Sequence, residues 1–361
     1  MQLRPALEAE LDLVSLGECM IRLSPPGHDR IEFTPSFEVY VGGGEYNVAY
    51  ALSRLGLRTG WIGGLVDNPV GAIVRNHART AGIDVSAAVT FAFDGVGRKA
   101  RMGLNFTEVG IGPRASVTLY DRGYSATSQL KPGDVNWDDL FGRRGVRWFH
   151  TGGIFTCLSD TTSEVAAEAI KAAHRHGTVV SYDLNFRSKL WDSATAIATT
   201  RPLLPYVDCL IGNEEDFQKS LGYEVEGVGT NLTELPVDAY RAMVRRVVAD
   251  NANLSLVGTT LREVSSASRN RWSAMLYDAA RDAFHQGPSF DLEVEDRVGG
   301  GDGFASGFIW TYLSGRDDPQ AAVNVGTAHG ALLQTTRGDT SQVTLAELLS
   351  VAAGGGARIQ R

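Results

Sequence analysis

The sequence contains little cysteine and no long apolar run. Its three cysteines, Cys19, Cys157 and Cys209, are widely spaced and form no CxxC pair. Such a set argues against disulfides or a zinc site and favours small buried residues in a reducing compartment. No apolar stretch approaches the roughly 20 residues of a membrane span, and the first ten residues do not resemble a signal peptide. We therefore expect a soluble, cytoplasmic protein.

Positive charge is also in short supply. The 34 lysines and arginines are outnumbered by 42 acidic residues, which gives a net charge of −8 and a pI near 5.4. This balance argues against a nucleic acid or a membrane surface as partner. An anionic small substrate is still compatible, because local arginines can override the global sign. With 361 residues, 43% of them hydrophobic, the chain can form one large α/β domain with or without a smaller unit.

Several familiar catalytic motifs are missing. The chain has no GxxxxGK[ST] phosphate loop and no GxGxxG dinucleotide fingerprint. It also lacks GxSxG and HExxH, and its seven histidines show no metal-binding spacing. These absences disfavour a P-loop kinase, a dehydrogenase, a serine hydrolase and a zinc protease.

A glycine-rich stretch, DRVGGGDGFASG at 296–307, lies between a predicted strand and an apolar helical run. Gly299, Gly300 and Gly301 have no side chains, so their backbone N–H groups can converge on an anion. The positive end of the following helix points to the same place. Asp302 stands where this helix begins. A carboxylate beside an anion site indicates a general base for phosphoryl transfer, whereas the simpler interpretation is a helix N-cap.

A second glycine cluster, Gly42-Gly43-Gly44, opens the predicted helix that continues through Asn47. The glycines could let a ligand approach the backbone at a helix N-terminus. A tight turn between a strand and a helix explains them equally well. The pattern is not a dinucleotide fingerprint.

Elsewhere, apolar strands alternate with helices of ten or more residues, which indicates a mostly parallel sheet sandwiched by helices. Two β-rich segments, 20–44 and 97–124, interrupt this α/β pattern, and we expect them to pair into a small β lid. The core then comprises residues 11–19, 45–96 and 125–348. Residues 1–10 and 349–361 are expected to be flexible. An antiparallel pair, Trp272–Tyr277 with Ala283–Gln286, is predicted at the sheet edge.

Three polar clusters follow predicted strands, where ligands of open α/β sheets bind. Arg187 can contact a carboxylate or phosphate, or simply pair with a surface acid. Tyr120 and Arg122 offer a phenol and a second cation on the lid, or a solvated strand. Asn213 and Asp216 could hold a hydrated Mg²⁺, or form an acidic helix start.

The segments Val41-GGGEYNVAYALSRLG-Leu57 and DRVGGGDGFASG together resemble the ribokinase-like (phosphofructokinase-B-type) carbohydrate kinases. Further segments are most similar to the family members that act on 2-keto-3-deoxygluconate: YDLNFRSKLW at 182–191, GNEED at 212–216 and HGALLQTTRGD at 329–339. The matches run from about residue 13 to 348. The resemblance implies a ribokinase-like fold.

The resemblance also implies the reaction: ATP-dependent phosphorylation of the primary hydroxyl of a 2-keto-3-deoxy sugar acid. Asp302 would be the base, and the amides of Gly299, Gly300 and Gly301 would form the anion hole. The residues that would bind the sugar acid are Gly42, Gly43, Asn47, Asn105, Tyr120, Arg122 and Arg187. Here the two arginines would face the carboxylate.

Nucleotide and metal roles are likewise implied by the resemblance. Asn213 and Asp216 would organise Mg²⁺–ATP through water, and Gly258 would open a nucleotide loop after Val257. Asp296 corresponds to a residue near a monovalent-cation site, such as K⁺, in some relatives. The family also suggests a homodimer formed through the lid strands.

The sequence departs from the family pattern at several of these positions. Gly300 replaces a common alanine, Asp216 replaces a glutamate, and Asn105 stands where some keto-acid kinases have tyrosine. Two alternatives stay open: a kinase for fructose, 2-keto-3-deoxygalactonate or another sugar, and a non-catalytic sugar-binding protein on the same fold. A dehydrogenase ranks third.

Overall fold

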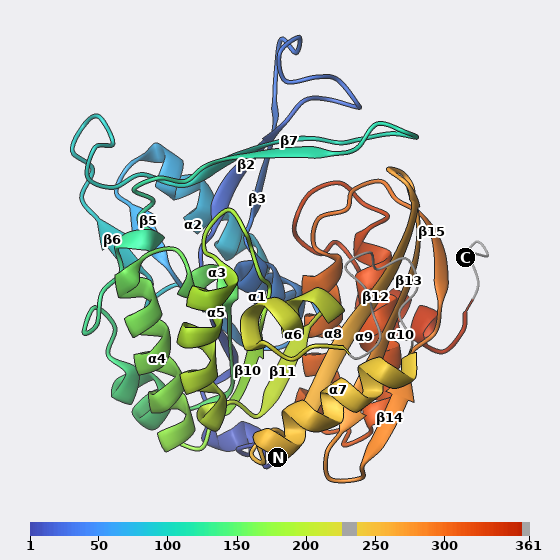
Figure 1. Ribbon diagram of the computed structural model, residues 1–361. Helices are drawn as coiled ribbons and strands as arrows, with labels where there is room; N and C mark the ends of the chain where they lie inside the picture. Colours follow the sequence, from blue (N-terminus) through green and yellow to red (C-terminus); the bar gives the residue numbers. More distant parts are fainter. Residues whose placement is uncertain (226–236, 356–361) are drawn as a thin grey trace.

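A large twisted sheet with helices on both faces forms most of the molecule (Figure 1). The computed structural model describes residues 1–225 and 237–355. Within them the sheet runs in the order β14-β13-β12-β11-β10-β9-β1-β4, and β15 also pairs with β13. From β4 to β12 all neighbours are parallel, whereas β13, β14 and β15 are antiparallel. The strands are β1 Leu11–Leu16, β4 Thr59–Ile62, β9 Val146–Gly152, β10 Val179–Asp183, β11 Cys209–Gly212, β12 Leu256–Ser266, β13 Arg269–Asp278, β14 Ala283–Gln286 and β15 Phe290–Glu293.

The strands are apolar on both sides because each face of the sheet is covered. In β1, Leu13 packs into the core beneath one helical layer and Val14 into the core beneath the other. The first layer contains α1 Gly44–Arg54, α2 Pro69–Ala81, α8 Gly300–Leu313, α9 Pro319–Leu333 and α10 Leu345–Ala352. The second contains α4 Asp160–Arg175, α6 Glu214–Leu221 and α7 Val237–Asp250. Among residues 1–225 and 237–355, no helix has the length and apolar character to span a membrane.

Four strands form a separate small sheet at the top of Figure 1: β2 Met20–Ser24, β3 Glu38–Gly42, β7 Leu104–Glu108 and β8 Val117–Asp121. Their order is β3-β2-β7-β8, so the prediction that segments 20–44 and 97–124 pair is confirmed. The register of the four strands places one row of paired residues on each face of the small sheet. Tyr40, Arg22, Asn105 and Tyr120 lie side by side on one face, and Val39, Leu23, Phe106 and Leu119 on the other.

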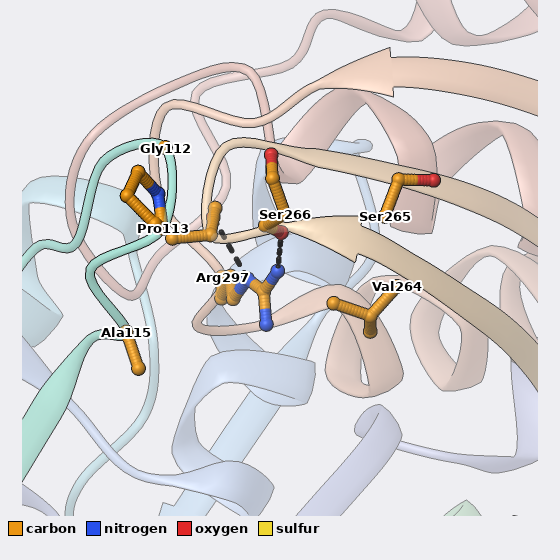
Figure 2. A pocket seen from close by; sticks show the side chains of 8 residues that line it. Gly112, Pro113, Ala115, Val264, Ser265, Ser266 and Arg297 are labelled. Atoms are coloured by element: carbon orange, nitrogen blue, oxygen red, sulfur yellow. Dashed lines mark hydrogen bonds between the residues drawn. The ribbon is translucent and has the colours of Figure 1, made fainter.

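The turn between β7 and β8 reaches the tip of the β12–β13 hairpin. Ala267 N donates to Gly112 O at 2.8 Å, and Gly112 N donates to Ser268 Oγ at 3.3 Å. Arg297 binds the same tip through the carbonyls of Ser266 and Ala267 (Figure 2). These groups border an open pocket of about 560 Å³ that does not include Asp302. We call the pair of hydrogen bonds between Gly112 and the tip of the β12–β13 hairpin the clasp.

The expected loop after Val257 is a wrong prediction. Residues 258–263 lie inside β12, where they continue the antiparallel ladder with β13 as far as Ser266. Threonine, leucine and valine in this segment favour an extended backbone, and the partner strand satisfies its polar groups. Within the β-rich segment 20–44, residues 31–35 lie outside the regular strands, and Phe33 N donates to Arg30 O in a turn.

Residues near both ends of the chain make contacts or regular structure, and the expected flexibility of residues 1–10 and 349–361 stays a prediction. Arg4 donates hydrogen bonds to the carbonyls of Phe141 and His176, so the first residues contact the core. Helix α10 and the Asp138–Gly145 π-helix were not predicted. Smaller elements complete the fold: η1 Ala6–Glu8, β5 Gly64–Val66, β6 Val89–Phe91, η2 Thr127–Gln129, α3 Gly153–Thr156, α5 Ser193–Thr200 and η4 Arg201–Tyr206. The end of the predicted loose tail, 356–361, lies outside the described residues.

Candidate active site

The glycine stretch forms a left-handed turn that starts α8. Gly299 is the N-cap, with φ of 86°. A Cβ atom there would lie 2.9 Å from Leu333 Cδ2 and 3.0 Å from Asp339 O, so glycine is required by both conformation and space. At Gly301 a Cβ would meet nothing within 4 Å, so this side of the turn is open. At Gly300 it would lie 3.0 Å from Gln334 Nε2, and the alanine of relatives needs a small shift of that side chain.

Asp302 lies in the first turn of α8, but it is not the helix cap. Gly299 holds the N-cap position, and no side chain caps the helix there. The Asp302 carboxylate instead accepts a hydrogen bond from Asn47, with 2.7 Å between Asn47 Nδ2 and Asp302 Oδ2. The other amide atom, Asn47 Oδ1, accepts from Gly43 N at 3.2 Å. The N-cap interpretation is therefore wrong, and Asn47 links the second glycine turn to Asp302.

The surroundings of Asp302 make it a stronger base than an ordinary carboxylate. Burial raises its pKa to about 6; the Asn47 hydrogen bond and the charge of Arg187 lower the pKa, and the charge of Asp339 raises it. Near neutral pH the group is still mostly ionised. It therefore has the pKa expected of a base that works close to physiological pH.

Gly42 and Gly43 are explained in this structure by close packing. A Cβ on Gly42 would lie 2.2 Å from Asp339 Cβ, and one on Gly43 only 1.8 Å from Glu18 O. Gly44, in contrast, has room, since its Cβ would lie 3.6 Å from Asp302 Oδ1 and 3.9 Å from Asn185 Nδ2. A side chain at Gly44 would therefore make only ordinary contacts with Asp302 and Asn185, unlike one at Gly42 or Gly43.

Three acids that the sequence analysis did not single out, Glu18, Glu45 and Asp183, lie near enough to Asp302 or to one another to interact by charge. Glu18 follows β1 and Glu45 lies in the first turn of α1; each has one carboxylate oxygen without a hydrogen-bond partner in the described residues. The pKa of Glu45 is raised to about 8, chiefly by burial and also by the charges of Asp302 and Glu18, while a backbone hydrogen bond and the charge of Arg122 lower it. Burial also raises the pKa of Asp183, at the end of β10. The position of Glu18 and Asp183 at the ends of predicted strands was the feature of the sequence that could have identified them as candidate site residues.

The two predicted substrate arginines differ in their partners. Arg122 is paired with Glu18, with 2.8 Å between Arg122 Nε and Glu18 Oε2 and a second contact from Nη2, and its guanidinium lies 5.2 Å from the ring centroid of Tyr120. Arg187 is exposed and donates to Phe186 O at 2.9 Å. Within the described part of the chain Arg187 has no carboxylate partner. It is therefore the cation available to an incoming anion.

Arg187 follows a strained turn. Asn185 has φ of 34°, a left-handed conformation that is uncommon outside glycine. The next amide, Phe186 N, donates to Asp216 Oδ1 at 2.9 Å, and Asn213 N donates to Asp216 Oδ2 at 2.9 Å. Asp216 thus connects the start of α6 to the turn that carries Asn185 and Arg187.

The magnesium prediction can be tested against these contacts. Asn213 and Asp216 form a reciprocal capping box at the start of α6, as the simpler interpretation stated. Each Asp216 oxygen already accepts one backbone N–H, so its remaining lone pairs fit water in the shell of a Mg²⁺ better than direct coordination. Among residues 1–225 and 237–355, no group of three or more His, Cys, Asp or Glu side chains could hold a metal.

Gly258 and Asp296 have other partners than those predicted. Gly258 lies within β12, and a Cβ there would lie 2.9 Å from the Phe304 ring, so packing accounts for the glycine. The Asp296 carboxylate is occupied by a guanidinium, with 2.5 Å between Arg22 Nη2 and Asp296 Oδ2. Asn105 is buried on the small sheet, where it lies between Arg22 and Tyr120. Thr107 Oγ1 donates to Asn105 Oδ1 at 3.1 Å.

The fold, the anion turn and the carboxylate beside it define an enzyme that phosphorylates a sugar. Comparison with models of known families matches residues 10–235 to the pfkB family carbohydrate kinases. The chain belongs to this family and is a sugar kinase.

Individual relatives agree with this family. The chain is 32% identical over 350 residues to 2-dehydro-3-deoxygalactonokinase of Haloferax volcanii, covering 97% of this chain and 99% of that protein. It is 28% identical to 5-dehydro-2-deoxygluconokinase of Bacillus licheniformis, over 94% and 95% of the two chains. Among solved structures, 2-dehydro-3-deoxygluconokinase of Thermotoga maritima superposes with a TM-score of 0.87 at 36% identity, over 95% and 98%.

A fructokinase from Xylella fastidiosa, solved with bound ATP, has the same fold with a TM-score of 0.71 at 20% identity, over 95% of this chain and 98% of that one. The expected ribokinase-like fold is confirmed. The alternatives of a non-catalytic binding protein and a dehydrogenase are not supported.

Proposed function

We propose that the protein transfers the terminal phosphoryl group of ATP to the primary hydroxyl of a 2-keto-3-deoxy sugar acid. The leading substrate is 2-keto-3-deoxygluconate, which would become its 6-phosphate. One observation carries this assignment: Asp302, held by Asn47, lies close enough to Arg187 for the charge of that guanidinium to lower its pKa. A base and a free guanidinium at one site suit a substrate with a hydroxyl at one end and a carboxylate at the other.

Each group has a defined part in the proposed reaction. Asp302 accepts the hydroxyl proton, so that an alkoxide-like oxygen attacks the terminal phosphorus. The turn at Gly299, Gly300 and Gly301 presents backbone N–H groups to the oxygens of the transferring phosphoryl group, together with the N-terminus of α8. Gly43 holds the Asn47 side chain in place, which keeps the Asp302 carboxylate aimed at the hydroxyl, and Gly42 packs beside it against Asp339.

Mg²⁺ bound with ATP would supply charge neutralisation on the phosphates. Asp216 and Asn213 would reach it through water. Both side chains also cap α6, and Asp216 fixes the Asn185 turn, so their first role is to position Arg187. Gly258 packs against Phe304. We therefore propose that it contacts the nucleotide through its backbone alone.

The small sheet, within segments 20–44 and 97–124, is proposed to act as a lid over residues 11–19, 45–96 and 125–348. Its row of Tyr40, Arg22, Asn105 and Tyr120 contains two of the predicted substrate residues, Asn105 and Tyr120. The clasp joins its tip to the core across the site. A lid of this kind excludes water from the transferring phosphoryl group, which protects ATP from hydrolysis.

The opposite row of the small sheet supports a homodimer. Val39 and Leu119 are more than half exposed, at 54% and 52%, and Leu23 and Phe106 lie between them in register. An exposed apolar stripe across four strands is a liability in a monomer. We propose that a second copy of the chain covers it, in a reducing cytoplasm compatible with the free thiols of Cys19, Cys157 and Cys209.

A second substrate, 2-keto-3-deoxygalactonate, is favoured by the relative from Haloferax volcanii. The two acids share the carboxylate and the terminal hydroxyl, so Asp302 and Arg187 serve both equally. The test is release of ADP from Mg²⁺–ATP with each of these acids, with fructose and with ribose. Turnover of a keto acid at a kcat/KM at least about tenfold above the neutral sugars is expected. Preference for a neutral sugar would refute the proposed substrate class.

A further inference from the structure

Arg22 is the most deeply buried arginine near the glycine turn, and the reaction outlined above does not use it. It lies on β2 of the small sheet and is 1% exposed. Its Nε donates to Ser24 Oγ at 2.9 Å, its Nη1 to Asp339 Oδ2 at 3.3 Å and its Nη2 to Asp296 Oδ2 at 2.5 Å. The ring of Tyr40 lies over the guanidinium, 5.4 Å from its centroid.

The two acids that Arg22 contacts support the anion turn from both sides. Asp296 Oδ1 accepts from Val298 N at 3.3 Å, directly before Gly299, and Asp296 Oδ2 also accepts from Gly338 N at 3.3 Å. The carbonyl oxygen of Asp339 packs against Gly299, at 3.0 Å from the place of a Cβ. A single guanidinium therefore reaches both segments that shape the turn.

Asp339 also packs against the second glycine turn. Its Cβ lies 2.2 Å from where a Cβ of Gly42 would be. Movement of Asp339 would therefore displace Gly42 and the adjoining Gly43. Gly43 in turn is hydrogen-bonded to Asn47. The guanidinium of Arg22 thus fixes the relative position of the anion turn and the segment that orients Asp302.

Two buried carboxylates so close together need a cation between them, because isolated buried charges are strongly unfavourable. Arg22 supplies that charge with a rigid planar group that bonds both acids at once. The guanidinium of Arg22 thereby neutralises the Asp296 carboxylate, which does not fit the predicted role of Asp296 at a K⁺ site. The position that a monovalent metal ion would take beside Asp296 is instead suited to the side chain of Arg22.

We propose that Arg22 is a positioning residue for phosphoryl transfer, which acts as the resident cation between Asp296 and Asp339 and makes turnover independent of a monovalent metal ion. The proposal deepens the function proposed above, because it concerns the same anion turn. Arg22 belongs to the small sheet. The proposal therefore also means that this sheet contributes to the geometry of the phosphoryl site itself.

The first experiment measures turnover of the purified full chain in KCl, NaCl and tetramethylammonium chloride at equal ionic strength. Wild-type kcat is expected to agree within about twofold among the three salts. A requirement for K⁺, seen as a loss of about tenfold or more in tetramethylammonium chloride, would overturn the proposal. This arm needs no variant and so does not depend on folding of a mutant.

The second experiment compares Arg22→Met and Arg22→Lys with Arg147→Met. Arg147 is a matched control, because it is 7% exposed and its Nη1 contacts Asp12 Oδ1 at 3.1 Å near the amino ends of β9 and β1, away from the glycine turns. Arg22→Met should lower kcat by about 100-fold, the order expected when a reacting group is misplaced by about 1 Å, with little change in the KM of the sugar. Arg22→Lys should restore part of kcat, since it returns the charge without the two-sided contact.

Arg147→Met should lose thermal stability to a similar degree but keep kcat within about threefold. Equal losses of kcat in Arg22→Met and Arg147→Met would mean that Arg22 is only structural, and wild-type kcat in Arg22→Met would mean that it has no positioning role. These outcomes differ from failure of the proposed function, in which the wild type would phosphorylate no keto acid. The salt comparison would then be made on whichever sugar is phosphorylated.

Discussion

Asn47 and Asp302 are 255 positions apart in the sequence and share one hydrogen bond, 2.7 Å between Nδ2 and Oδ2. Gly43 N fixes the orientation of the Asn47 amide, because a backbone N–H can only donate. The amide nitrogen must then face the carboxylate. The proposed base, Asp302, is consequently oriented by the glycine turn that was expected to bind sugar.

This relationship predicts the pH profile. Asp302 must be ionised to accept a proton, so kcat/KM should fall as the pH drops through the pKa of about 6. The Asn47 hydrogen bond lowers this pKa, and Asn47→Leu should therefore shift the acid limb upward. Asn253→Leu is the matched control, since Asn253 bonds the carbonyls of Leu204 and Val207 away from the site. An unchanged limb in Asn47→Leu would contradict the assignment.

Asp302→Asn separates catalysis from stability. Turnover should fall by about 100- to 10,000-fold with little loss of sugar binding, measured by calorimetry. The folded-state pKa is raised from 3.8 to about 6, so ionised Asp302 destabilises the fold once the pH exceeds this range. The variant should consequently melt a few degrees higher than wild type at pH 8 and show no gain at pH 4. Near-normal turnover would mean that another group is the base.

Arg187→Ala tests recognition of the carboxylate. Loss of a charge-assisted hydrogen bond should raise the KM of keto acids by about 10- to 100-fold, while neutral sugars change by less than about threefold. Lys189→Ala, which removes an exposed cation from the same loop, should leave both classes unchanged. Equal losses for acids and neutral sugars would show that Arg187 does not face a carboxylate.

The pair of Glu18 and Arg122 predicts a loss of stability in addition to any loss of binding. Arg122→Met leaves Glu18, 2% exposed, without its cation, and this should cost about 3–5 kcal/mol of unfolding free energy. Arg122→Met combined with Glu18→Gln should recover much of that loss. Urea unfolding of the two single variants and the double variant measures the coupling. Additive losses would mean that the pair does not interact as the short contact indicates.

Leu119→Asp tests the proposed dimer. Light scattering should give about twice the 38.8 kDa chain mass for the wild type and the single mass for the variant. Leu7→Asp is the control, because Leu7 is fully exposed at 101% on the η1 turn away from the small sheet. A monomeric wild type would refute the dimer, and a dimeric Leu119→Asp would place the interface elsewhere.

The main architecture could be predicted because it depends on local patterns. Apolar runs between helices gave the parallel sheet, and alternation in 20–44 and 97–124 gave the small sheet. The glycine motif pointed to Asp302 because a carboxylate beside a possible anion site calls for a chemical role, and its part as the base stays a prediction. Strand β12 was missed beyond Gly258, because its polar residues become a ladder only through pairing with β13.

The contacts of charged residues could not be predicted in the same way. Arg22 looks like an ordinary polar position in an alternating strand, and its partners Asp296 and Asp339 lie more than 270 positions away. Glu18 and Glu45 look like surface acids, since burial of a carboxylate depends on tertiary packing. Asp216 was read as a metal residue, although its role in the Phe186 turn depends on a hydrogen bond across two strand ends.

The clasp has a consequence for the timing of turnover. Only two hydrogen bonds join Gly112 to the hairpin tip, and together they contribute about 1–3 kcal/mol. Breaking them is fast on the scale of a typical catalytic cycle. One of the two bonds, from Ala267 N to Gly112 O, joins backbone atoms alone, so a side-chain substitution at the tip can remove only the bond to Ser268 Oγ and leaves half of the clasp in place.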